Sequence, residues 1–79
     1  MEEETWRSRI TSDPEVMGGE PVVKNTRVSV SVIVGSMADG MTEEELLEAF
    51  PQITSEDIRA CLKYAAESAQ NDIRYSQAV

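Results

Sequence analysis

Residues 18–30 constrain the fold more than any other stretch, because they hold an adjacent glycine pair and a proline. Glycine adopts positive φ without steric cost and proline fixes φ, so the chain must turn here. Two valines then give a segment of strand length, and Asn25-Thr26 offers a second turn before a valine-rich run. We therefore expect a hinge between a small β arm and a helical body. Its structural residues are expected to be Gly18, Gly19, Pro21 and Arg27.

Arg27 has a specific predicted role in this hinge. The planar guanidinium can satisfy several acceptors at once, so it suits a position that fastens a turn. We expect Arg27 to pair with a carboxylate of the helical body or with backbone carbonyls.

The small size of the chain limits its core. At 79 residues it is one domain, and such a core gives only about 3–5 kcal/mol of net stability. The single cysteine, Cys61, cannot form an internal disulfide, and the absence of histidine nearly excludes a structural zinc site. We therefore expect a homodimer or a tight partner complex. With no apolar run of membrane-spanning length and an acidic start unlike a signal peptide, the expected location is cytoplasmic.

The N-terminal part of the chain predicts a β arm. Residues 1–9 are charged, and we expect them to be flexible, with Trp6 capping the core or packing at an interface. A short strand at residues 10–12 would pair with residues 21–23 in a hairpin that needs something to pack on. The expected division of the single domain, 1–79, is a flexible N-terminus at 1–9, a β arm and turn at 10–28, a trihelical body at 29–70 and a tail at 71–79.

Residues 28–34 are ambiguous between strand and helix. Valines at every second position are typical of a half-buried strand. The same segment keeps helical spacing when Met37 is included, Ser29 is a good N-cap, and Gly40 is a good helix end. We choose the helix, because a strand would leave residues 35–39 without a role.

Two further helices have clear start signals. Thr42 and Glu45 form a capping box, and Pro51 ends the helix that follows. Thr54 then caps an amphipathic helix that reaches about Gln70, with Cys61 as a buried, inert thiol on its inner stripe. A helix, a short turn and a longer helix match helix-turn-helix spacing. The predicted fold class is mainly α, a three-helix homeodomain-like bundle with a short N-terminal β hairpin or arm.

The charge of the chain is strongly segregated. The net charge is −8, and residues 39–57 hold seven acids and no base. Such a surface repels nucleic-acid phosphate and attracts a basic partner. Simple solubility explains the same charge about equally well.

Short motifs follow one another between residues 10 and 66. They are Ile10-Thr11-Ser12-Asp13-Pro14, Gly18-Gly19-Glu20-Pro21-Val22-Val23, Asn25-Thr26-Arg27-Val28, Gly40-Met41-Thr42, Phe50-Pro51 and Leu62-Lys63-Tyr64-Ala65-Ala66. In order and spacing they resemble the family named domain of unknown function 433. Glu20 and Asn25 depart from the resemblance, since a basic residue and a glycine are common there.

The resemblance implies both a fold and a role. Members of the family are similar to homeodomain-like three-helix proteins, and many sit beside a nuclease-like toxin of the PIN type. An antitoxin-like role in a type II toxin–antitoxin pair is therefore implied. No catalytic residue is carried over.

An enzyme is not expected from these residues. The chain has no histidine, no phosphate-cradling glycine loop followed by Lys-Ser/Thr, and no partner for the thiol of Cys61. Consecutive glutamates on a helix point in different directions, so they form a solvated face more readily than a cation site. We expect no catalytic residues, no metal and no cofactor.

Two functional hypotheses remain, together with an alternative that assigns no specific function. In the first, Glu43, Glu44 and Glu48 contact a basic rim on a nuclease-like toxin. In the second, Arg59 and Lys63 contact DNA from the last helix, although the acids at its start disfavour this. The alternative is a solitary structural or interaction domain in which Lys63 pairs with Glu67.

Overall fold

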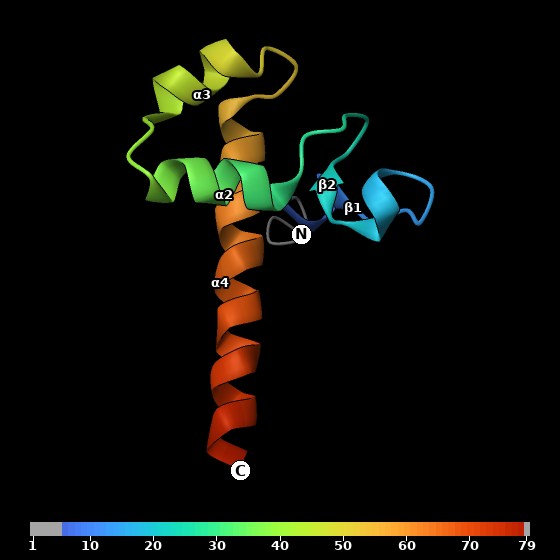
Figure 1. Ribbon diagram of the computed structural model, residues 1–79, viewed down its shortest axis with the longest axis vertical. Helices are drawn as coiled ribbons and strands as arrows, with labels where there is room; N and C mark the ends of the chain where they lie inside the picture. Colours follow the sequence, from blue (N-terminus) through green and yellow to red (C-terminus); the bar gives the residue numbers. More distant parts are fainter. Residues whose placement is uncertain (1–5, 79) are drawn as a thin grey trace.

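The computed structural model describes residues 6–78, with side chains described for residues 6–70. After residue 10 it contains a two-stranded antiparallel sheet and three helices, which confirms the mainly helical fold with a short N-terminal hairpin (Figure 1). The strands are β1 (Ile10–Thr11) and β2 (Val22–Val23), joined by a loop that carries the 3-10 helix η1 (Met17–Gly19). The helices are α2 (Val30–Ala38), α3 (Glu43–Ala49) and α4 (Ser55–Ala78).

The β arm turns where the glycine pair predicts it. Gly18 has φ +66° and Gly19 has φ +90°, the left-handed conformation that glycine adopts most easily. The turn brings β2 back antiparallel to β1, with Ile10 opposite Val23 and Thr11 opposite Val22. The arm lies to one side of the helices in Figure 1, next to the start of α2.

The ambiguous valine run is divided between sheet and helix. The Val23 amide donates to the Val28 carbonyl, and Ser29 bridges Val22, so the start of the run is extended and pairs with β2. The Ser29 hydroxyl then accepts from the Val32 amide at 3.1 Å and caps α2, as predicted. From Val30 onward the backbone is helical, and this conformation buries both Val30 and Ile33, which lie one turn apart.

Both later helices begin with reciprocal side-chain caps. In the predicted box of α3, the Glu45 amide donates to the Thr42 hydroxyl at 3.1 Å and the Thr42 amide donates to Glu45 at 2.9 Å. A second box precedes α4, where the Asp57 amide donates to the Thr54 hydroxyl at 3.2 Å and the Thr54 amide donates to Asp57 Oδ2 at 2.9 Å. These caps satisfy amides that would otherwise lack a partner at each helix start.

The core lies where α2 crosses α4, with α3 packed near the first turns of α4 (Figure 1). Ile33, Leu46 and Cys61 are completely buried at its centre. Burial, together with the nearby Asp57 carboxylate, raises the pKa of the Cys61 thiol to about 11. The thiol is therefore neutral at physiological pH, which agrees with the predicted structural role. The buried cluster consists of Val23, Val28, Val30, Ile33, Leu46, Ile53, Ile58 and Cys61.

α4 is longer than the sequence predicts. It continues past Gln70, its expected end, to Ala78, so residues 71–78 of the expected tail are helical. Its second half projects clear of the rest of the molecule in Figure 1. Despite this length, none of the described helices is apolar enough to cross a membrane.

Candidate partner-binding surfaces

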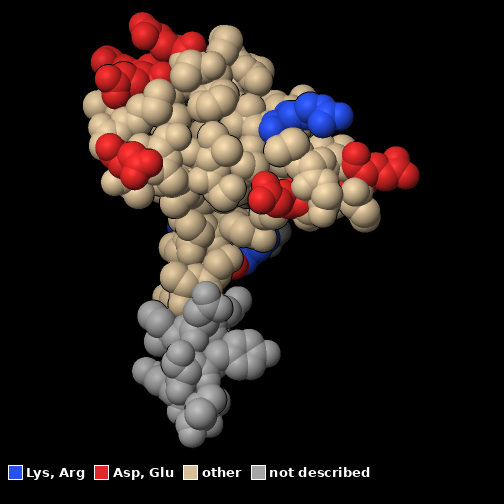
Figure 2. Space-filling model, viewed as in Figure 1, with Lys and Arg blue, Asp and Glu red and all other residues tan. Residues whose placement is uncertain are grey.

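The acidic surface of α3 contains the three glutamates predicted to bind a partner. Glu43, Glu44 and Glu48 are exposed and form no ion pair or hydrogen bond within the described chain. Glu45 is also exposed, but its carboxylate is occupied by the capping box. Glu43 and Glu44 lie in the first turn, where the helix dipole stabilises a negative charge. Figure 2 shows acidic atoms gathered over this corner of the molecule.

The outward face of α4 contains the two predicted DNA contacts. Arg59 and Lys63 are exposed, one turn apart, and neither is in an ion pair with another described residue. The pair expected between Lys63 and Glu67 is not formed. Instead Glu67 Oε2 accepts from Arg7 Nη2 at 2.7 Å, so its carboxylate is directed toward the N-terminal segment. Arg59 and Lys63 are therefore free to meet a ligand.

Arg9 fastens the β arm to the start of α4, a role that the sequence does not predict for it. Its Nη1 donates to Asp57 Oδ1 and its Nη2 to Glu56 Oε1, each at 3.0 Å. Asp57 is 7% exposed, and its second oxygen holds the Thr54 amide, so one buried carboxylate serves both the arm and the helix cap. Residues 6–9 are thus attached to α4; residues 1–5 of the predicted flexible N-terminus lie outside the described residues.

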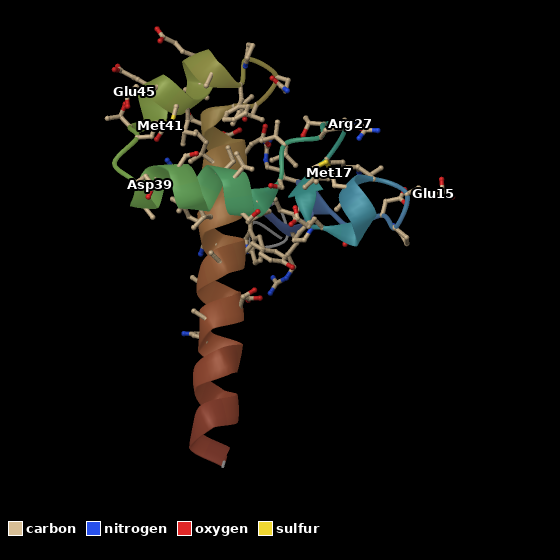
Figure 3. All side chains as sticks on the ribbon, in the orientation of Figure 1. Glu15, Met17, Arg27, Asp39, Met41 and Glu45 are labelled. Atoms are coloured by element: carbon tan, nitrogen blue, oxygen red, sulfur yellow. The ribbon has the colours of Figure 1, made fainter. Side chains whose placement is uncertain are left out.

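The predicted role of Arg27 is wrong. Its side chain is exposed and makes no hydrogen bond or ion pair with any described residue. Figure 3 shows it projecting from the loop between β2 and α2, away from α4. The loop is held instead by Thr26, whose hydroxyl donates to the Val23 carbonyl at 2.8 Å and accepts from the Val28 amide at 3.0 Å. Arginine is the right residue type for the hinge, but Arg9 performs the role.

The arm and α4 enclose an open groove of about 370 Å³. Trp6 and Tyr64 line it, and the guanidinium carbon of Arg7 lies 4.6 Å from the Trp6 ring centroid, within cation–π range. Trp6 thus packs at the junction of arm and helix. Among the described side chains, no group of three or more metal-binding residue types comes together.

The profile of the family described as "Protein of unknown function (DUF433)" matches residues 10–65, which is most of the chain. The chain belongs to the DUF433 family. That range covers both strands, α2, α3 and the first half of α4, including the α3 acids and the bases of α4, whereas Trp6, Arg7, Arg9 and Glu67 lie outside it.

Two further proteins resemble the chain. The crystal structure of a DUF433 member protein from Anabaena variabilis superposes with a TM-score of 0.76, at 28% identity, over 94% of this chain and 73% of that one. The uncharacterized protein y4eO of Sinorhizobium fredii is 44% identical over 59 residues. That stretch is 75% of this chain but only 27% of the longer relative, so the chain spans about a quarter of that protein.

Proposed function

We propose that this DUF433 protein is an antitoxin-like partner of a type II toxin–antitoxin pair, which binds and neutralises a PIN-like nuclease. The observation that carries the proposal is the free acidic surface of α3, formed by Glu43, Glu44 and Glu48. A nuclease must attract phosphate and so presents a basic rim, which such a surface complements. We further propose that the protein acts in the cytoplasm as a homodimer, because its monomeric core is small.

Electrostatic complementarity acts mainly on the rate of association. Neutralising all three residues, as Glu43→Gln, Glu44→Gln and Glu48→Gln, should slow binding of a PIN-like nuclease partner by roughly tenfold at low salt and flatten the salt dependence of that binding. Folding should be unaffected, since Thr42 and Glu45 still form the capping box. The variant Glu15→Gln/Glu20→Gln removes exposed acids from the arm instead and is the control.

A second candidate function is operator binding through α4. It is favoured by Arg59 and Lys63, which are exposed and unpaired on one helix face. Removing the α3 acids should then tighten binding to a fragment of the chain's own promoter, while Arg59→Ala and Lys63→Ala should weaken it. Tighter DNA binding by the α3 variant, with unchanged binding of the nuclease-like protein, would favour this function over the first.

A further inference from the structure

A second open groove lies on the β arm, separate from α3 and from the Trp6 groove. It encloses about 450 Å³ between the loop that follows β1 and the turn that follows β2. The half-buried Val16 contributes apolar surface to it, the buried Val22 lies at its base, and Lys24 and Arg27 contribute cationic side chains. The groove therefore combines an apolar lining with positive charge, on a chain whose net charge is −8.

The two cations of this groove are available. Arg7 and Arg9 are occupied by carboxylates of α4, whereas Lys24 and Arg27 are exposed and make no ion pair within the described chain. One acid, Asp13, also lines the groove, where its carboxylate accepts from the Glu15 amide at 3.0 Å, so the lining has two cations and one carboxylate. In Figure 2 the basic patch near the arm stands well apart from the acidic atoms over α3, at the place where Figure 3 labels Arg27.

The loops around this groove hold strained backbone. Met17 and Asn25 are the non-glycine residues with positive φ in the described chain, at +54° and +67°, and each belongs to one of the two loops. Asparagine tolerates this conformation, but for methionine it is uncommon. Met17 is also 42% exposed, although it is a large apolar residue. Strain of this kind is often retained where a loop is shaped to meet a ligand.

We propose that this groove, here called the arm groove, binds an acidic segment of a second protein. An apolar side chain of that segment would pack on Val16, whose neighbour in the loop, Met17, is an exposed and adaptable apolar side chain. The carboxylates of the segment would meet Lys24 and Arg27. Nucleic acid fits less well, because none of the residues that line the groove is aromatic and bases would have nothing to stack on. The proposal does not depend on the function proposed for α3.

The test is a titration of the ¹⁵N-labelled protein with the peptide Ac-Glu-Glu-Leu-Glu-Glu-NH₂, followed by NMR. We expect chemical-shift changes at the amides of Lys24, Asn25 and Arg27, which line the groove. The variant Lys24→Gln/Arg27→Gln should raise the Kd roughly 2- to 30-fold, the range for the loss of two exposed charge pairs. It should fold normally, because neither side chain has a partner in the described chain.

The controls test separately the charge of the peptide, its apolar side chain and the position of the binding site on the protein. The variant Arg59→Gln/Lys63→Gln removes the same charge from α4 and should leave the Kd unchanged. A peptide with glutamine in place of glutamate, and one with alanine in place of leucine, should each bind more weakly. The proposal is overturned if millimolar peptide shifts none of the arm-groove amides or if the α4 variant loses binding equally. It is also overturned if a single-stranded oligothymidylate binds there more tightly, or if these amides shift with protein concentration alone, which would identify a second copy as the occupant.

Discussion

Replacing Arg9 tests the idea that one arginine holds the arm on the helical body. In Arg9→Ala, the Asp57 carboxylate still accepts from the Thr54 amide but no longer pairs with the Arg9 guanidinium. Glu56 loses its only described partner. The side chain of Asp57 is 10% exposed and that of Arg9 is 32% exposed, so this pair lies between a surface salt bridge and a buried one. We therefore expect Arg9→Ala to lower the free energy of unfolding by about 1.5–3 kcal/mol. This is more than the loss of a surface pair costs and less than the loss of a fully buried pair.

For a domain of this size, 1 kcal/mol corresponds to a change of about 4–8 °C in Tm, so Arg9→Ala should melt roughly 6–24 °C lower. Urea unfolding followed by circular dichroism measures the same loss as a free energy. Most of it should arise at Asp57, because the side chain of Glu56 is 72% exposed. Glu56→Gln should therefore cost less than about 1 kcal/mol. Arg9→Lys should lie between wild type and Arg9→Ala, since an ammonium keeps the charge but cannot reach both carboxylates as a fork.

Two arginines of the same chain serve as controls for Arg9. Arg7 pairs with Glu67, but both side chains are about half exposed, at 48% and 53%. Arg7→Ala should therefore cost at most about 1 kcal/mol. Arg27→Ala should have almost no effect, because the side chain has no described partner. If Arg9→Ala melts like Arg27→Ala, Arg9 does not fasten the arm.

Two further predictions concern a cap and the buried thiol. Thr42→Ala removes one side of the α3 capping box and should lower the free energy of unfolding by about 0.5–2 kcal/mol in urea, whereas an unchanged midpoint would contradict the cap. The Cys61 thiol has a folded pKa of about 11 against an ordinary value of 9.0. The folded state therefore binds more protons between those values, so stability should fall as pH rises from about 9 to 11. Cys61→Ser should lack this particular decline, and the folded wild-type thiol should react with a disulfide reagent only as fast as the protein opens.

The sequence predicted best those features whose partners lie within a few residues. The Thr42–Glu45 capping box, the Thr54 cap and the Ser29 cap each join residues three positions apart, so the residue types alone specify them. The glycine pair is similar, since positive φ at Gly18 and Gly19 is a local requirement of the turn. Local rules also explain why the helical alternative for residues 30–38 was the better one.

Contacts between distant residues could not be predicted in this way. Arg9 and Asp57 are 48 positions apart, and no local pattern indicates which of several arginines meets that carboxylate. The same limit explains the wrong role for Arg27, and the wrong partner for Glu67, which lies 60 positions from Arg7. The base nearest to Asp57 in the sequence is Arg59, which forms no ion pair with it, so sequence proximity points to the wrong partner.

Arg7 and Arg9 form ion pairs within the chain, and this bears directly on whether the partner is a toxin or DNA. In the DNA hypothesis the arm would supply phosphate contacts, but here its two N-terminal arginines are bound to α4 by three ion pairs. To reach a phosphate, Arg9 would have to leave the buried Asp57 uncompensated, at a cost that a single phosphate contact does not recover. Among the described side chains of α4 two free bases remain, Arg59 and Lys63, and Lys24 and Arg27 lie on the arm. Since each neutralised phosphate contributes a slope of about −0.9 to the salt dependence of binding, the α4 face alone gives a weak polyelectrolyte term.

The acids of α3 face no such conflict, because all three are already free, and this is why the protein partner is the better supported of the two.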